Sequence, residues 1–242
     1  MRITEDSWAA MELIGLVGLG WRLSPSEITL AIGAVLIPAG LIAFALGRGQ
    51  RDRALINYAG YALAIWATFA MQAWVGRPTG EHNLKGISGD FMQLPYAWFY
   101  LRFVRAYFKV EQWSPRWSRF YRRLEWAYVL PLALLVMRLV TGWDVASWVI
   151  LVLNLTNLIA SYMLAMRSWL QRREGSGWFI IGVLPLVLAG LLLAVQWAVE
   201  PGGSNINGLL PFWLGVVLQL ILFMAALAVR RRRTMTGPDS LA

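Results

Sequence analysis

The stretch "LPFWLGVVLQLILFMAALAVRRRR", residues 210–233, joins a long apolar segment to four consecutive arginines. A hydrocarbon core about 30 Å thick is crossed by roughly 20 apolar residues in a helix, so the apolar part predicts a transmembrane helix. The arginines predict its cytoplasmic end, because short loops and tails rich in lysine and arginine stay in the cytoplasm. We expect the rest of the chain to follow the same plan.

The composition agrees with a membrane protein. Of the 242 residues, 58% are hydrophobic and only 14% are charged, which is more apolar surface than a soluble domain of this length can hide. The net charge is +9, but the basic residues lie at the ends of apolar segments and form no separate basic domain. The charge therefore indicates membrane topology, and we expect no nucleic-acid partner.

Seven segments are long enough to cross a bilayer, which predicts an all-α, polytopic seven-transmembrane helix bundle. Of the 22 lysine and arginine residues, 17 follow the first, third, fifth and seventh segments. This alternation places the amino terminus outside and the carboxyl terminus in the cytoplasm of a bacterial inner membrane. The expected segments are Ile28–Gly47, Ala54–Val75, Asp90–Phe108, Trp126–Trp143, Ala146–Trp169, Trp178–Val199 and Gly208–Val229.

The bundle is expected to occupy residues 27–233, followed by a short cytoplasmic tail at residues 234–242. Residues 1–26 are expected to be extracytoplasmic. Within them, residues 7–23 place Glu12, Gly15 and Arg22 on one helical face, which favours an interfacial helix with its apolar face toward the lipid. An eighth transmembrane span is the alternative for this stretch.

Polar side chains inside the membrane are the candidate binding residues, because burying them in lipid is costly. In the fifth segment, Asn154, Asn157 and Ser161 share one helical face, which must point into the bundle. They form either a ligand pocket or interhelical hydrogen bonds worth about 0.6 kcal/mol each. Arg138 extends to the headgroups or pairs with an acidic residue, namely Asp90, Asp144 or Glu200. The further ligand-binding candidates are Gln93, Tyr96, Gln196 and Glu200.

The longest inner loop, "RFVRAYFKVEQWSPRWSRFYRRLEW", predicts a cationic hairpin that turns at Ser114 and Pro115. Its first half extends the third segment as a basic helix, and its second half begins the fourth. Such a hairpin attracts anionic lipid, or docks an acidic partner. The candidate contact residues are Arg105, Lys109, Arg116, Arg119, Arg122 and Arg123.

The sequence offers little for catalysis. It has no cysteine and one histidine, His82, in an outer loop, so we expect no metal site, no haem and no other cofactor. Paired carboxylates within the membrane and a glycine-rich phosphate loop are also missing, so we expect no enzymatic activity. The lack of an acidic residue at mid-membrane and of similar halves makes a small-solute transporter the least favoured class.

Four runs in order resemble a known family. They are "GRGQRDRALINYAGYALAI", the basic hairpin with "AYVLPLALLV" after it, "AMRSWLQRREGSGWFIIGVLPLVLAGLLL" and "LPFWLGVVLQLILFMAALAVRRRR". The set, over about Glu27–Arg233, resembles the bacterial seven-transmembrane receptors with diverse intracellular signalling modules; the seven-span region of some sensor histidine kinases is the runner-up. The resemblance implies a sensor, usually with an extracellular ligand-binding domain before the first span and a signalling enzyme after the last.

The 242 residues hold neither of those two domains, so we expect a non-enzymatic module that couples an extracytoplasmic or intramembrane ligand to a separate protein or to a second copy of itself. The alternatives are an accessory subunit of a larger membrane complex and a piece of a longer receptor. A sensor predicts a hydrated outer pocket rimmed by Trp143, Glu200, Asn205 and Asn207. An accessory subunit predicts a sealed bundle with an exposed small-residue or aromatic face.

Overall fold

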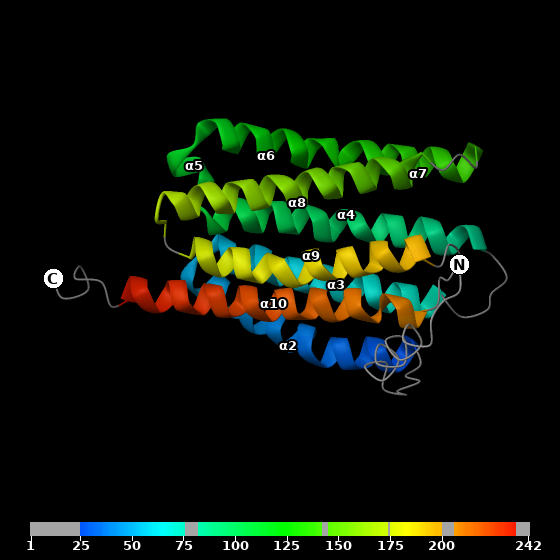
Figure 1. Cartoon of the computed structure of the whole chain (residues 1–242), viewed down its shortest axis with the longest axis horizontal. Coiled ribbons are helices and arrows are strands. Elements are labelled where there is room, and N and C mark those ends of the chain that lie inside the picture. The colour runs from blue at the N-terminus through cyan, green and yellow to red at the C-terminus, as the bar shows by residue number, and fades with distance from the viewer. Residues whose placement is uncertain (1–24, 76–81, 142–144, 174, 200–205, 236–242) are drawn as a thin grey trace, which may run out of the picture.

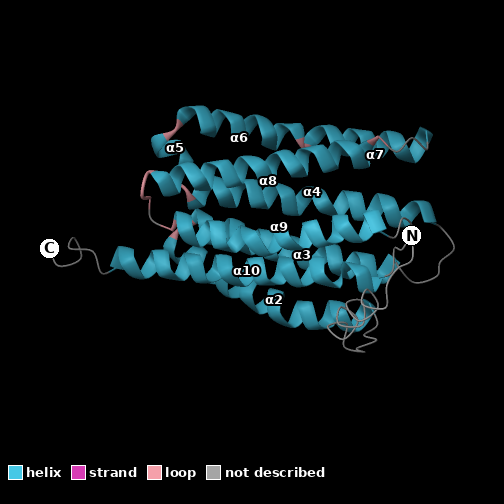
Figure 2. Cartoon of the chain, in the orientation of Figure 1, coloured by secondary structure: helices cyan, strands magenta, loops and turns pink. Residues whose placement is uncertain are grey.

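The computed structural model describes residues 25–75, 82–141, 145–173, 175–199 and 206–235, and these residues form helices with no strand among them. The helices run side by side along the long axis of the molecule (Figure 1). Figure 2 shows that the described loops are short and that, apart from the break between α6 and α7, they lie at the ends of the bundle. The helices are α2 (Pro25–Gln50), α3 (Arg53–Val75), α4 (His82–Tyr107), α5 (Val110–Trp113), α6 (Pro115–Ala127), α7 (Val129–Thr141), α8 (Ala146–Leu170), α9 (Ser176–Val199) and α10 (Ile206–Met235).

The third and fourth expected segments differ in detail from the structure. Helix α4 begins at His82, eight residues before the expected start at Asp90, and it ends at Tyr107. Lys109 therefore lies in a turn with a left-handed backbone. The sequence had predicted that Lys109 would extend the helix, and that prediction is wrong. The fourth expected segment, Trp126–Trp143, includes the last two residues of α6 and all of α7, and these two helices are separated at Tyr128. Pro131 explains this interruption, because proline has no N–H to donate to the preceding turn.

Within the described residues, three helical segments are long and apolar enough to cross a membrane: Leu30–Gln50, Arg53–Met71 and Ala146–Leu170. Helix α4 is more polar than these, and the break at Tyr128 shortens the apolar run of α7. In α9 and α10 the described apolar stretches are the shorter segments Ser176–Ala189 and Leu214–Arg230. The chain is thus an all-helical, multi-pass membrane protein. The stretch expected to form an interfacial helix, residues 7–23, lies outside the described residues.

The basic turns gather at one end of the bundle, on the left in Figure 1. The α2–α3, α4–α5 and α8–α9 turns lie there together with the end of α10. Each of these three turns holds one basic residue with positive φ: Arg51 (54°), Lys109 (48°) and Arg172 (54°). We call this the basic end of the bundle.

Aromatic packing forms the core on one side of α4. Phe103 of α4, Phe179 of α9 and Phe223 of α10 are fully buried. The rings of Phe179 and Phe223 stack with centroids 4.8 Å apart, and Phe103 lies 5.1 Å from Phe223. Tyr58 of α3 meets Phe103 edge-on at 5.9 Å. On its other side α4 contacts α6, α7 and α8, so this helix joins the two halves of the bundle.

The outer faces of the helices are apolar, as expected for contact with hydrocarbon. Leu41 on α2, Met137 on α7, Leu155 on α8 and Leu188 on α9 are all exposed. Since these side chains would be poorly placed against water, their exposure supports a lipid environment around the described helices.

Gly215 allows α9 and α10 to approach closely. A Cβ at this position would lie 2.8 Å from the Pro185 carbonyl oxygen and 2.6 Å from the Ala189 Cβ. Overpacking of this kind costs about 1–3 kcal/mol, so Gly215→Ala should lower the melting temperature in detergent by roughly 2–10 °C. Gly49→Ala is the control, because nothing lies within 4 Å of a Cβ there. An unchanged melting temperature for Gly215→Ala would contradict the close α9–α10 packing.

Candidate functional site

The inward face of α8 carries the polar residues that the sequence singled out. Asn157 and Ser161 are buried, with 3% and 0% of their surface exposed, and Asn154 is partly buried. Their spacing of three and four residues places them on one side of the helix. This side faces α4, α6 and α7, where further polar side chains meet it.

Asn154 joins three helices at the middle of this interface. Its Oδ1 accepts a hydrogen bond from the Tyr128 hydroxyl at 2.9 Å. Its Nδ2 donates to Gln93 Oε1 of α4 at 3.0 Å. Tyr128 lies at the junction of α6 and α7, so the helix break positions a donor opposite α8.

A charged group lies toward the opposite end of the bundle from the basic turns. Arg138 of α7 donates to the Asp90 carboxylate of α4 at 2.9 Å, and each side chain is 14% exposed. Arg138 also donates to the Ser147 hydroxyl of α8 at 3.2 Å. The Ser147 hydroxyl donates in turn to the Asp90 carboxylate. Arg138 thus meets Asp90, one of the three acidic partners considered from the sequence; Asp144 and Glu200 lie outside the described residues.

A third polar group lies closer to the basic end. The Tyr121 hydroxyl of α6 donates to Ser161 Oγ, and Ser161 Oγ donates to Asn157 Oδ1, both at 3.3 Å.

Together these groups form a polar seam along the facing sides of α4, α6, α7 and α8. Each group contains at least one side chain of α8, and each group bridges at least two helices. Such contacts hold neighbouring helices in one relative orientation, and they can be exchanged for others without breaking a covalent bond. The seam consists of Asp90, Gln93, Tyr121, Tyr128, Arg138, Ser147, Asn154, Asn157 and Ser161.

Of the remaining ligand-binding candidates, Tyr96 is the one whose side chain the structure describes. Tyr96 lies on α4 with its ring 6.5 Å from that of Tyr61 on α3. Gln196 falls on a part of α9 whose side chains are outside the described set, and Glu200 is likewise outside it. The expected outer pocket around Trp143, Asn205 and Asn207 also falls outside the part of the chain that the structure describes.

Tyrosines on α3 form a separate contact with α10. The Tyr61 hydroxyl donates to Gln219 Oε1 at 3.1 Å, and the Tyr58 hydroxyl donates to the Leu220 carbonyl oxygen at 2.8 Å. Both contacts lie in the buried core. They connect the last described helix to the half of the bundle that contains α2 and α3.

The cationic hairpin is present, with its basic residues in two environments. Arg105 is partly buried and paired with Glu125 at 2.7 Å and with Glu111. Arg122 lies 3.7 Å from Glu111. On α6 the exposed candidates are Arg116, Arg119, Arg122 and Arg123, and Lys109 is exposed in the turn before α5.

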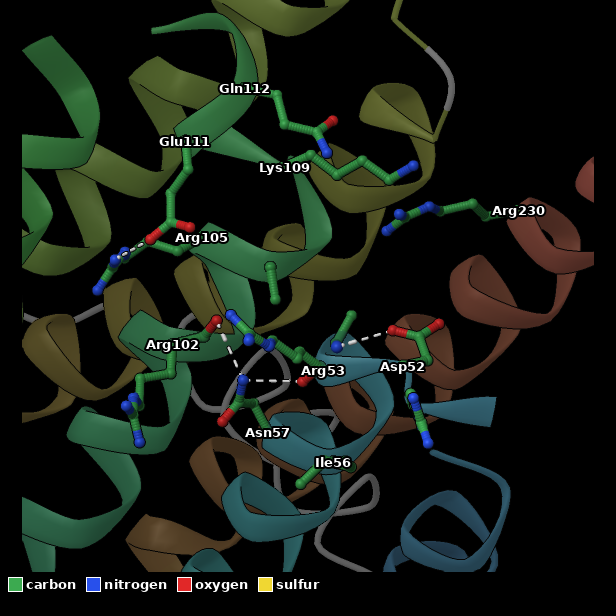
Figure 3. Close-up of a pocket in the computed structure, with 13 residues that line it drawn as sticks. Asp52, Arg53, Ile56, Asn57, Arg102, Arg105, Lys109, Glu111, Gln112 and Arg230 are labelled. Atoms are coloured by element: carbon green, nitrogen blue, oxygen red, sulfur yellow. Dashed lines mark hydrogen bonds and ion pairs between the residues drawn. The ribbon is translucent and has the colours of Figure 1, made fainter. Parts of the chain in front are cut away.

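A polar cavity of about 700 Å³ opens at the basic end of the bundle (Figure 3). Its walls come from the α2–α3 turn, the start of α3, the end of α4, the turn and helix α5 that follow, and Arg230 of α10. We call it the basic cavity. It contains Arg105 and Lys109 of the predicted contact residues, together with four arginines that the sequence did not single out as a site: Arg51, Arg53, Arg102 and Arg230.

Several residues of the seam were missed from the sequence. Tyr121 and Tyr128 are seven residues apart and so share one helical face, which is a periodic signal of the same kind as in α8. Ser147 lies seven residues before Asn154 on the same face of α8, so the same periodic signal could have found it. Among the described residues, no group of three or more His, Asp and Glu side chains is placed to hold a metal ion.

The contact between Asp90 and Arg138 provides a test of the seam. Asp90→Asn or Arg138→Gln alone leaves a poorly solvated charge without its main partner, so each should lower the free energy of unfolding by roughly 3 kcal/mol. The double variant should lose less than the sum, by at least about 1 kcal/mol. Chemical unfolding in mixed micelles measures all four proteins of this cycle. Strictly additive losses would show that the two side chains do not stabilise each other.

The comparisons with known proteins agree with this architecture. No curated protein and no solved structure matches the chain significantly. A family model described as 7TM diverse intracellular signalling matches residues 28–230, which include most of the helical bundle. The chain therefore belongs to the 7TM diverse intracellular signalling family.

Proposed function

We propose that the protein is a seven-span, receptor-like module that responds to an extracytoplasmic or intramembrane ligand and passes the change to a separate protein partner. It acts by conformational coupling, without chemistry of its own. Membership of a receptor-type family supports a sensor role. The polar seam is the observation that carries the mechanism, because its three groups are exchangeable contacts that join α8 to α4, α6 and α7.

The seam fits a switching element better than a purely structural one. Each of the three polar groups joins α8 to at least one neighbouring helix, and each depends on how those helices are rotated and shifted along their axes relative to α8. A ligand that changes one group shifts the balance among helix arrangements by its difference in affinity for them. Aromatic packing on the other side of α4 transmits the shift to α9 and α10, because Phe103 contacts both Phe179 and Phe223.

In this proposal the basic end is cytoplasmic, in a bacterial inner membrane, and the amino terminus is outside. The gathering of the arginine-rich turns at one end supports that orientation. The second candidate is an accessory subunit of a larger membrane complex. In that case the seam would only fix the packing of the helices.

Introduced cysteines test the orientation, because the natural sequence contains none. Thr141 and Arg119 are both exposed and lie at opposite ends of the α6–α7 rod. In intact cells, a membrane-impermeant maleimide should label Thr141→Cys at once and Arg119→Cys only after permeabilisation. The reverse pattern would place the basic end outside.

Spin labels at Leu170→Cys on α8 and Ala228→Cys on α10 test the coupling, since both positions are exposed. Asn154→Leu removes the bonds to Tyr128 and Gln93, at a cost of about 1 kcal/mol, so the fold should survive. We expect it to shift the distance distribution between the labels in lipid bilayers. Val152→Leu, on the exposed side of the same helix, is the control and should leave the distribution unchanged. One narrow distance, unaffected by either change, would favour the accessory subunit.

A further inference from the structure

We propose that the basic cavity is a binding site for a phosphate-bearing anion. The cavity is formed by residues from four parts of the chain that meet at the basic end: residues 51–57, residues 102–106, residues 109–112 and Arg230. The proposal goes beyond the receptor role. It depends on the proposed orientation only for the compartment from which the ligand comes.

The cavity holds more positive charge than its own acidic residues can balance. Six basic residues and two acidic ones line it. Both carboxylates are already engaged. Asp52 Oδ1 accepts from the backbone N–H of Ala54 at 2.8 Å, which caps the first turn of α3. Glu111 pairs with Arg105 (Figure 3).

Several of the basic side chains therefore remain available to a ligand. Apart from Arg105 and Arg230, four basic residues line the cavity. Within the described residues, no carboxylate lies within ion-pair distance of these four. Arg102 instead stacks over the Trp98 ring at 4.4 Å. The remaining three are Arg51, Arg53 and Lys109.

Arg230 brings the last described helix into the cavity. Its guanidinium donates to the Tyr107 carbonyl oxygen at 2.7 Å, at the carboxyl end of α4. Figure 3 shows Lys109 and Arg230 extending toward the same space from opposite sides. Two cations that face one space repel each other unless an anion lies between them, because like charges disfavour a shared site.

Two of these basic residues have an unusual backbone conformation. Arg51 and Lys109 have φ values of 54° and 48°, in the left-handed region where glycine is the favoured residue. The bonds Arg51 N–H to Arg48 O and Asp52 N–H to Gly47 O, 3.4 and 2.9 Å long, show that Arg51 occupies the helix-terminating position that glycine usually takes. Arg172 has the same conformation outside the cavity, so the conformation reflects helix termination, whereas the unbalanced charge of the cavity indicates the anion site.

The size and chemistry of the cavity define the ligand class. A volume of about 700 Å³ is in the range of sites for small organic ligands and exceeds what a single inorganic phosphate needs. Guanidinium groups bind phosphate oxygens through paired N–H donors, and the amides of Asn57 and Gln112 add neutral polar groups to the wall. Two sources share this chemistry: the phosphate headgroup of an anionic lipid, and a soluble phosphate ester.

Glycine substitutions make a matched test, because each one removes a single charge and relieves a left-handed backbone. Arg51→Gly and Lys109→Gly act on the cavity. Arg172→Gly is the control, since Arg172 has φ 54° at the same end of the bundle but does not line the cavity. None of the three should lower stability, since glycine adopts this conformation without strain.

The full chain, in neutral detergent at about 0.15 M salt, is titrated by calorimetry with inorganic pyrophosphate and, separately, with phosphatidylglycerol in mixed micelles. We expect at least one of the two probes to bind saturably, with one molecule bound per chain. Arg51→Gly and Lys109→Gly should each weaken it about fivefold, and Arg172→Gly less than twofold. Binding of pyrophosphate assigns a soluble phosphate ester, and binding of phosphatidylglycerol alone assigns a lipid headgroup.

Two results would overturn the proposal. One is the absence of saturable binding for both probes, and the other is an equal loss of affinity in all three variants, which would indicate diffuse attraction to the basic end. Neither result depends on the receptor role, because the titration measures binding without signalling. Conversely, a rigid α8–α10 distance would leave this site intact.

Discussion

A polar side chain in hydrocarbon must find its partner inside the protein, because the lipid offers no donor or acceptor. In this bundle that constraint decides how α4, α7 and α8 face one another. Their apolar side chains are as stable against lipid as against a neighbouring helix, so apolar surface alone selects no helix rotation. The contacts of Asp90 with Arg138, and of Asn154 with Tyr128 and Gln93, do select one.

Helix α4 is where two kinds of packing meet. Toward α3, α9 and α10 it presents aromatic rings such as Phe103, which fill space and are fully buried. Toward α7 and α8 it presents Asp90 and Gln93, which form directional bonds. Close-packed rings move together, whereas hydrogen bonds can change partners at small cost. A response to a ligand would therefore begin on the polar side of α4 and be carried by the aromatic side.

The basic residues at the basic end have two roles. Arginine and lysine in short turns set the orientation of a membrane protein during insertion, whatever the turns do afterwards. The fold then brings several of these turns together around one cavity, where their charges act as a group. Arg105 shows the difference, because its two carboxylate partners neutralise it and leave it a structural residue. Arg51, Arg53 and Lys109 have no such partner among the described residues.

The sequence by itself determined the helical class, the approximate positions of the helices, the basic end and the inward face of α8. All of these follow from local properties, namely the length of apolar runs, the positions of charges and the spacing of Asn154, Asn157 and Ser161. The turn at Lys109 was not foreseen, because it depends on a left-handed backbone conformation that the hydropathy pattern hides. Only the tertiary structure decided the partners. Asp90 meets Arg138, and Tyr121 meets Ser161, across 48 and 40 residues of sequence. The basic cavity also joins distant segments, and no pattern along a single segment encodes a contact between two of them.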